Sequence, residues 1–226
     1  MTKEDQIQSQ LIWDAPTRLF HWLLVVLLGF SWWSAKTDHM QWHQYSGITV
    51  SGLMIFRILW GVIGSSTARF KEFVRSPREV WRYIRFDNTS ALEKLGHNPL
   101  GGWSVVALLL MVTVQFVSGL FAIDIDGLEE GPLSYLVEFD SGRTASRIHH
   151  GAFNFLLGLV VVHVVAVFFY LLIKRRNLIR PMITGRQERA RGIDMVSTIL
   201  APRWRLLVSI LIAGLLAYSI SKGLRY

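Results

Sequence analysis

Long apolar stretches, separated by polar connections, dominate the hydrophobic pattern of this chain. An amphipathic helix of a soluble domain would instead show apolar positions every three or four residues. A helix needs roughly 20 apolar residues to cross a hydrocarbon layer about 30 Å thick. Five stretches of 16 to 26 residues meet or approach that length: Arg18–Ala35, His43–Ile63, Pro99–Ile123, Ile148–Ile173 and Leu206–Ser221. The pattern predicts an all-α integral membrane protein, in which the short fifth stretch either spans the membrane or is tilted or re-entrant.

The composition supports the same class. Hydrophobic residues make up 51% of the 226 residues and charged residues only 18%, against about 25% charged residues in soluble proteins. The chain has no cysteine, which excludes disulfides, iron–sulfur clusters, thiolate zinc sites and covalently attached c-type haem. The polar N-terminus lacks the basic region and cleavage site of a signal peptide, so we expect the first apolar stretch to remain as a membrane anchor.

Charge is distributed unevenly over the connections between the apolar stretches. The connection after the second stretch and the one after the fourth are basic, whereas the connection after the third is acidic. Basic loops of membrane proteins remain in the cytoplasm. This predicts a multi-pass protein of the bacterial inner membrane with a cytoplasmic N-terminus and an acidic loop outside. The net charge of +8 is then explained by topology, and we expect no nucleic-acid partner.

A short helix is expected within the first basic connection. Ser76 can cap it, Pro77 suits its first position, and Glu79 completes a capping box. The helix of about Pro77–Phe86 alternates arginines with apolar side chains. We interpret it as an interfacial helix lying on anionic membrane lipid, with docking of a cytoplasmic partner as the alternative.

Histidines are the unusual feature of the apolar stretches, because an ionisable group in hydrocarbon is costly without a partner or a function. His149 and His163 are 14 residues apart, which places them on nearly the same helix face and about 21 Å apart along the axis. His150 points about 140° away from that face. With the predicted topology, His21 reaches the depth of His163, and His43 reaches the depth of His149.

Two interhelical histidine pairs stacked in this way suit two six-coordinate, non-covalently bound haems b, since helix bundles build cofactor sites from side chains on facing helices. Each histidine could instead form a hydrogen bond with backbone or lie in the headgroup region. A zinc site fits less well, because neither pair includes a carboxylate or a thiolate. Glycines within the stretches could admit a flat macrocycle or allow close helix packing; these are Gly29, Gly47, Gly52, Gly119 and Gly158.

Two arginines are candidate partners of haem propionates. Arg57 follows His43 by 14 residues and therefore shares its face near the inner pair. Arg18 lies three residues before His21. The alternatives are that Arg57 extends its charge to the interface and that Arg18 is an interfacial anchor.

Three segments carry a resemblance to a known family. WDAPTRLFHW around His21, WHQYSGITVSGLMIFRILWG around His43 and Arg57, and HHGAFNFLLGLVVVH across His149 to His163 resemble the prokaryotic cytochrome b561 family, which includes the b-type cytochrome subunits of nickel–iron hydrogenases. The likeness extends from about Trp13 to Gly185.

The resemblance implies a four-helix transmembrane bundle with two bis-histidine haems b. His21 and His163 would bind the inner haem iron, and His43 and His149 the outer one. We therefore expect a di-haem domain at residues 1–181, a basic cytoplasmic linker at 182–205 and a C-terminal transmembrane helix at 206–226. This fifth helix departs from the family pattern.

The resemblance also implies electron transfer between the quinone pool and a redox partner, either a c-type cytochrome or a hydrogenase-like subunit. The acidic loop Asp124–Asp140 could dock a basic partner or could simply be a solvated loop. His97 could take part in quinone protonation or could be an ordinary interfacial histidine.

Two other functions remain open. Some members of the family oxidise superoxide and reduce quinone, which requires a cationic patch near the outer haem. Arg143, Arg147 and Lys36 could form such a patch, although the acidic loop would repel an anion. A transporter with a histidine relay is the third possibility, but the apolar stretches contain no internal proline to break their helices.

Overall fold

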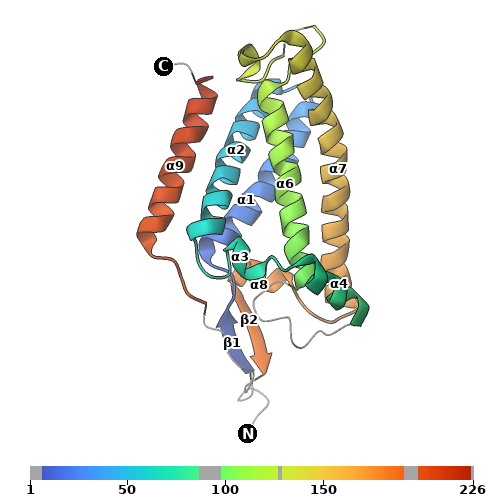
Figure 1. Cartoon of the computed structure of the whole chain (residues 1–226), viewed down its shortest axis with the longest axis vertical. Coiled ribbons are helices and arrows are strands. Elements are labelled where there is room, and N and C mark those ends of the chain that lie inside the picture. Colours follow the sequence, from blue (N-terminus) through green and yellow to red (C-terminus); the bar gives the residue numbers. More distant parts are fainter. Residues whose placement is uncertain (1–6, 87–97, 127–128, 191–197, 225–226) are drawn as a thin grey trace. The chain divides into compact units, whose positions relative to one another are not determined.

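A computed structural model of the chain describes residues 7–86, 98–126, 129–190 and 198–224. In these residues five helices are long and apolar enough to cross a membrane (Figure 1). They are α1 (Ala15–Lys36), α2 (Met40–Ile63), α6 (Pro99–Phe121), α7 (Phe139–Leu172) and α9 (Arg203–Ser221). The prediction of a mainly helical, multi-pass membrane protein is confirmed.

Helix α7 is longer than the sequence analysis predicted. It begins at Phe139 rather than at Ile148. Its first turns carry polar and charged residues, which is why they were not counted in the apolar stretch. These turns are packed closely, because the N–H of Ile123 donates to the carbonyl of Gly142 over 3.2 Å. A Cβ added to Gly142 would lie 2.3 Å from Cδ1 of Ile123. A side chain larger than hydrogen does not fit at this position.

Short elements lie before and between the long helices. They are α3 (Phe70–Phe73), α4 (Pro77–Phe86), α8 (Ile179–Thr184), the 3₁₀ helix Ser134–Leu136, and the strands β1 (Ile7–Leu11) and β2 (Arg186–Ala190). The two strands pair antiparallel, with Ile7 opposite Ala190 and Leu11 opposite Arg186. This two-stranded ribbon corrects the all-α prediction, which had no strand in it.

The chain forms two compact units, and each long helix passes through both. The first unit comprises Met1–Leu19, Leu59–Val106 and Val162–Leu206, and the second comprises Phe20–Ile58, Ala107–Val161 and Leu207–Tyr226. The units thus group segments that are distant in sequence. The division into domains at 181 and 205 stays a prediction.

The first unit is organised around the start of α1. Asp14 caps this helix, since its Oδ1 accepts the N–H of Thr17 over 3.0 Å. Its Oδ2 accepts the indole N–H of Trp60 over 2.9 Å. Both Asp14 and Trp60 are buried. The N–H groups of Ile12 and Trp13 donate to the carbonyl of Gly185, so that the ribbon holds the cap in place.

In the first unit, hydrogen bonds join the segment at the end of α2 to the segment at the start of α9. Ser66 donates its N–H to the carbonyl of Ile199 over 2.9 Å, and its hydroxyl accepts the N–H of Ile199 over 3.0 Å. Arg205 donates to the carbonyl of Ile63 over 3.2 Å. These bonds give α9 a fixed starting point next to α2.

The capping box of α4 and the helix bounds Pro77–Phe86 are both confirmed. The N–H and the hydroxyl of Ser76 donate to Oε2 of Glu79 over 3.0 and 3.1 Å. The N–H of Glu79 donates back to the Ser76 hydroxyl over 3.4 Å. The hydrogen bond from the Ser76 backbone lowers the pKa of Glu79 from its ordinary value.

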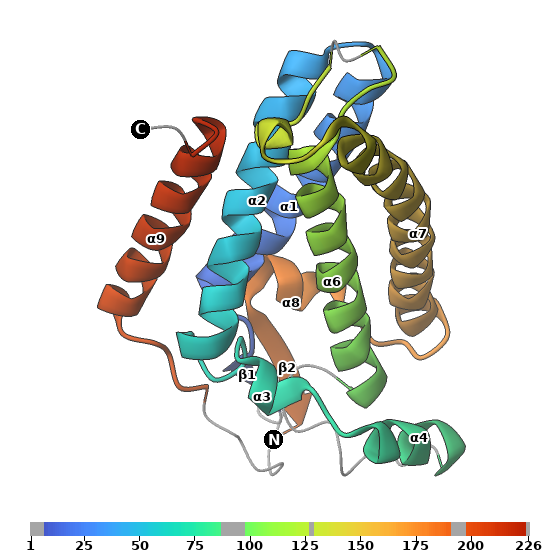
Figure 2. The ribbon, with the colours of Figure 1, turned by 45° about the horizontal axis from the view of Figure 1, so that its top comes forward.

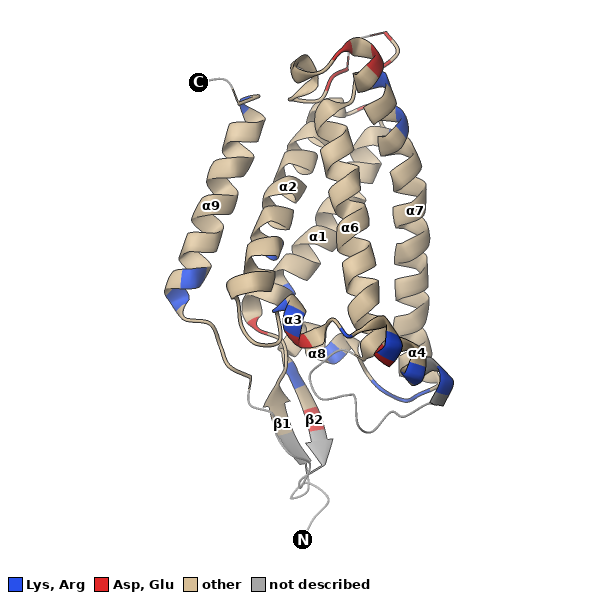
Figure 3. Ribbon diagram, viewed as in Figure 1, with Lys and Arg blue, Asp and Glu red and all other residues tan. Residues whose placement is uncertain are grey.

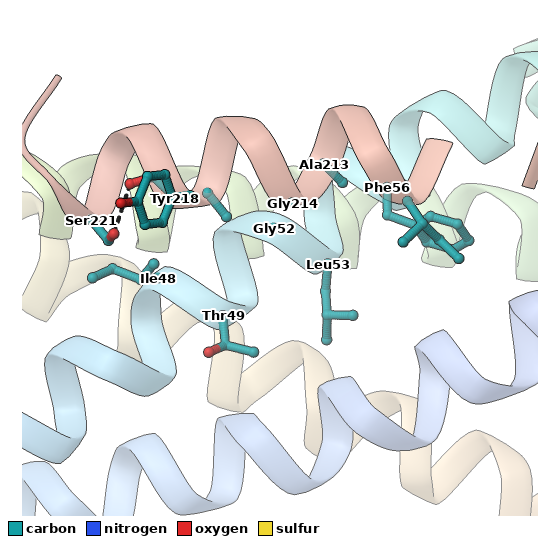
Figure 4. Close-up of a pocket in the computed structure, with 11 residues that line it drawn as sticks. Ile48, Thr49, Gly52, Leu53, Phe56, Ala213, Gly214, Tyr218 and Ser221 are labelled. Atoms are coloured by element: carbon teal, nitrogen blue, oxygen red, sulfur yellow. Dashed lines mark hydrogen bonds between the residues drawn. The ribbon is translucent and has the colours of Figure 1, made fainter. Parts of the chain in front are cut away.

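In the second unit α9 lies beside α2 (Figures 1 and 2). A Cβ added to Gly52 would lie 3.1 Å from Cβ of Ala217, so the two helices touch there. An open, largely apolar groove runs along this contact (Figure 4). At the far end of α9 the hydroxyl of Tyr135 donates to the carbonyl of Gly223. The predicted fifth helix is therefore packed against the rest of its unit.

Candidate functional site

Two of the predicted histidines meet in the second unit. His43 on α2 and His149 on α7 are half-buried, and their ring centroids lie 5.9 Å apart with the ring planes nearly perpendicular, at 87°. His150 follows His149 on the same helix and is exposed. The structure therefore places His149, and not His150, beside His43, as the helix phase predicts.

Backbone carbonyls hold both rings by the same atom. Nδ1 of His43 lies 2.9 Å from the carbonyl oxygen of Ser31 on α1, and Nδ1 of His149 lies 2.8 Å from that of Gln115 on α6. A carbonyl oxygen can only accept, so each Nδ1 carries a proton, and Nε2 is the ring nitrogen that can offer a lone pair to a metal. Histidines that bind metals through Nε2 are oriented by this kind of second hydrogen bond.

Helix α6 also shapes the space around His149. A Cβ added to Gly119 would lie 2.9 Å from Cε1 and 3.0 Å from Nδ1 of His149. Only glycine lets α6 approach the imidazole this closely. The side-chain Nε2 of Gln115 lies 3.1 Å from Nε2 of His149 and can only donate, so this ring nitrogen has a lone pair, which a metal would take in place of the amide.

The donor set decides which group the pair can hold. In the described parts of the chain, no three histidine, aspartate or glutamate side chains gather as a metal site. Two neutral imidazoles alone offer two ligands, so a metal bound here must bring its remaining ligands with it. An iron porphyrin would do so, and His43 and His149 would hold its iron through their imidazoles. The residues fit a b-type haem.

The other predicted pair is divided between the two units. His21 lies on the part of α1 in the second unit, where its ring packs edge-on against Trp22 with centroids 4.9 Å apart. His163 lies half-buried on the part of α7 in the first unit. The pairing of His21 with His163 stays a prediction.

Two further histidines lie elsewhere. His39 stacks on Trp33 with ring centroids 5.7 Å apart and has Thr37 as a hydrogen-bond partner at 3.0 Å. His97, for which quinone protonation was considered, lies outside the described residues.

The two candidate arginines have different surroundings. Arg57 on α2 is buried, with 4% of its surface exposed, and its guanidinium lies 6.0 Å from the ring centre of Phe20. Arg18 donates a hydrogen bond to the carbonyl of Ile183, next to the end of α8. This bond gives Arg18 a structural partner. The propionate role of both arginines stays a prediction.

Of the cations proposed for a superoxide site, Arg143 is engaged within its own unit. It donates to the carbonyl of Ile123 over 3.1 Å and approaches Oδ1 of Asp124 to 3.9 Å. Arg147 donates to the hydroxyl of Thr144 over 3.2 Å. An adjacent carboxylate offsets the charge of Arg143, which weakens the case for an anion-attracting patch.

The hydrogen-bond partners that orient the two imidazoles were not predicted from the sequence. Ser31 and Gln115 contact the rings through their backbone carbonyls and also through their side chains, since the Ser31 hydroxyl lies 3.0 Å from Nδ1 of His43 and the Gln115 amide lies 3.1 Å from Nε2 of His149. These polar residues were not singled out, because only the packing of α1 and α6 shows that they face the histidines. Gly119 was noted as one of five glycines, but its contact with His149 depends on the packing of α6 against α7. Gly29, Gly47 and Gly158 border open space.

These features define a helical membrane protein with an intramembrane histidine pair suited to haem. Comparison with protein families agrees: the chain matches the family model described as Prokaryotic cytochrome b561 over residues 12–185. The chain belongs to the prokaryotic cytochrome b561 family. It is therefore a membrane b-type cytochrome, and electron transfer is its class of function.

Named relatives are similar at low identity. The chain is 23% identical over 207 residues to the probable Ni/Fe-hydrogenase B-type cytochrome subunit of Azotobacter chroococcum, covering 77% of this chain and 86% of the relative. It is 24% identical over 194 residues to the probable Ni/Fe-hydrogenase 1 B-type cytochrome subunit of Escherichia coli K12, covering 71% and 82%. No solved structure matches the chain significantly.

Proposed function

We propose that this protein is a di-haem cytochrome that transfers electrons between the quinone pool and a redox partner protein. The observation that carries the proposal is the His43–His149 pair, whose two Nδ1 atoms are both held by backbone carbonyls. This arrangement presents two Nε2 lone pairs from facing helices without further ligands, as a bis-histidine haem requires.

The histidines have defined roles in this proposal. His43 and His149 bind one haem b, and His21 and His163 bind the other. Haem, when bound, supplies one-electron redox chemistry. The carbonyls of Ser31 and Gln115 fix the ring orientation of the first pair, and Gly119 leaves room for His149. Arg57, as a buried cation on the helix of His43, balances propionate charge.

The proposed topology places the N-terminus in the cytoplasm of a bacterial inner membrane. The basic residues of α4 and of the connection after α7 support it, because such residues remain on the cytoplasmic side. The acidic residues between α6 and α7, red in Figure 3, would then face outward. The described histidine pair would bind the outer haem.

The partner is proposed on chemical grounds and on the names of the relatives. Both relatives are named as cytochrome subunits of Ni/Fe hydrogenases, which favours a hydrogenase-like redox subunit. A c-type cytochrome with a basic surface is the other candidate, since the acidic loop would steer its approach. Quinone or quinol would exchange electrons at the opposite side of the protein.

A haem count on single variants tests the proposal. The purified protein should contain two haems b in a pyridine haemochrome assay. His43→Ala and His149→Ala should each lose one of the two haems. His150→Ala and His39→Ala are the matched controls and should keep both. A colourless wild-type protein expressed with sufficient haem, or loss of haem in His150→Ala but not in His149→Ala, would overturn the assignment.

A further inference from the structure

One face of α4 carries a cluster of cations around an aromatic ring. Arg78, Trp81, Arg82 and Arg85 follow the spacing i, i+3, i+4, i+7, so they share one side of this helix. All four are exposed, Trp81 to 57%. The guanidinium of Arg85 lies 4.9 Å from the ring centre of Trp81. We call these four residues the basic face of α4.

Side chains other than those of the basic face fix α4 to the ends of two membrane-spanning helices. The hydroxyl of Tyr83 lies 3.3 Å from that of Tyr170 on α7, and Asn98, directly before α6, donates to the Tyr170 hydroxyl over 2.6 Å. Trp103 on α6 donates to the carbonyl of Arg75 over 2.9 Å. All of these residues belong to the first unit.

This attachment determines the height of α4. Its partners lie in the first turns of α6 and the last turns of α7, and both of these helices are long and apolar enough to cross a membrane. In Figures 1 and 2, α4 lies at these helix ends. A helix held there lies at the level where hydrocarbon gives way to lipid headgroups.

Further cations follow at the same end of α7. Lys174 and Arg175 come directly after this helix and are exposed, and Lys174 is one helical turn beyond Tyr170. Figure 3 shows positive charge both on α4 and after α7. The single acidic residue of α4, Glu79, accepts hydrogen bonds from Ser76 and also interacts electrostatically with Arg82. Three arginines thus stand against one carboxylate, and the helix keeps a net positive charge.

We propose that the basic face of α4 binds the phosphate headgroups of anionic phospholipids in the adjoining leaflet. Arginine binds phosphate through two parallel N–H bonds, and a tryptophan ring prefers the headgroup level of a membrane. An acidic protein would suit the three arginines, but it would not account for the exposed Trp81 at the level of the helix ends. The proposal concerns lipid binding and does not depend on haem or quinone.

Site-directed spin labelling tests where the basic face lies. The natural chain has no cysteine, so Arg82→Cys creates a unique labelling site on the full protein. Glu188→Cys on β2, which is exposed, is the matched control. In vesicles of phosphatidylethanolamine and phosphatidylglycerol, the label at position 82 should be more accessible to oxygen and less accessible to a water-soluble nickel chelate than the label at 188. Equal accessibility at both positions overturns the proposal.

Lipid selectivity tests the charge of the face. Affinity of the detergent-solubilised full chain for phosphatidylglycerol, relative to phosphatidylcholine, can be measured by native mass spectrometry. Each arginine near an anionic surface contributes about fivefold, so Arg78→Gln, Arg82→Gln and Arg85→Gln together should lower the preference about a hundredfold.

The control is a triple variant, Lys36→Gln, Arg147→Gln and Lys222→Gln. It removes three exposed cations from the second unit. This variant loses the same charge and should keep the preference to within about threefold of the wild type, since its cations lie outside the basic face. Circular dichroism confirms that both variants keep their helix content. An unchanged preference in the α4 variant, or an equal loss in the control, overturns the proposal.

Discussion

Gly119 and His149 approach each other so closely that a Cβ at position 119 would lie 2.9 Å from Cε1 of the imidazole. The hydrogen bond between Nδ1 of His149 and the Gln115 carbonyl, one turn earlier on α6, depends on the same approach. Gly119→Ala should therefore displace the ring and remove one haem, seen as loss of about half the reduced-minus-oxidised haem absorbance if two haems are bound.

Gly214→Ala is the control for this variant. It lies on α9, which carries none of the candidate histidines, and an added Cβ there would meet nothing within 4 Å. The absorbance of this control should equal that of the wild type. Full absorbance in Gly119→Ala would show that the imidazole tolerates a methyl group at this distance, or that it does not hold haem.

Asp14 should be a strong determinant of stability. Asp14→Ala removes the cap of α1 and leaves the indole N–H of the buried Trp60 without its acceptor. Loss of a cap costs about 1 kcal/mol, and a buried unsatisfied donor costs about 1–3 kcal/mol. The unfolding temperature of the detergent-solubilised protein should fall by several degrees. Asp126→Ala, at an exposed position, should leave it unchanged, and an equal fall in both variants would contradict the role of Asp14.

Packing of α9 on α2 should depend on Gly52. A Cβ at this position already lies 3.1 Å from Cβ of Ala217, so Gly52→Leu must push the two helices apart. Overpacking of this kind costs about 1–3 kcal/mol, which should appear as a lower unfolding temperature. The comparison is Gly29→Leu on α1, where an added Cβ meets nothing within 4 Å. If Gly29→Leu destabilises the protein as much as Gly52→Leu, the contact with Ala217 is not the cause.

The start of α4 should loosen in acid. Its capping bond from Ser76 requires the ionised carboxylate, and this bond holds the pKa of Glu79 below its ordinary value of 4.5. The contribution is complete at neutral pH and is lost as the pH falls below 4.5 and through the lowered pKa.

Hydrogen exchange in the peptide covering α4, corrected for the intrinsic pH dependence of exchange, measures this effect. Protection should decrease at low pH in the wild type and should already be low at neutral pH in Ser76→Ala. Glu129→Gln, at an exposed position, should exchange like the wild type. Protection that does not change with pH would contradict the role of the Glu79 carboxylate.

The features that could be predicted from the sequence were those that depend on hydropathy and on the phase of a single helix. The five spans were found because twenty apolar residues have few alternatives to a membrane helix, and α4 was bounded correctly by Ser76, Pro77 and Glu79. The phase of α7 brought His149 rather than His150 to His43. The start of α7 was missed because its first turns carry Asp140 and Arg143, which are polar enough to be read as a loop.

Features that depend on segments distant in the sequence were not predictable. Strands β1 and β2 consist of IQSQL and RQERA, which have little apolar alternation and form a ribbon only when they meet. The carbonyls and side chains of Ser31 and Gln115 that contact His43 and His149 come from α1 and α6, and only the packing of these helices brings them to the rings. A single sequence cannot supply these three-dimensional neighbours.

The β1–β2 ribbon also constrains the order in which this protein matures. Strand β1 emerges from the ribosome before any of the spanning helices, yet the residues that pair with it are made only after α7 and α8. Asp14 and the carbonyl of Gly185 come together at the same step. The start of α1 therefore lacks its partners until α7 and α8 have been made, at a time when only α9 is still to follow.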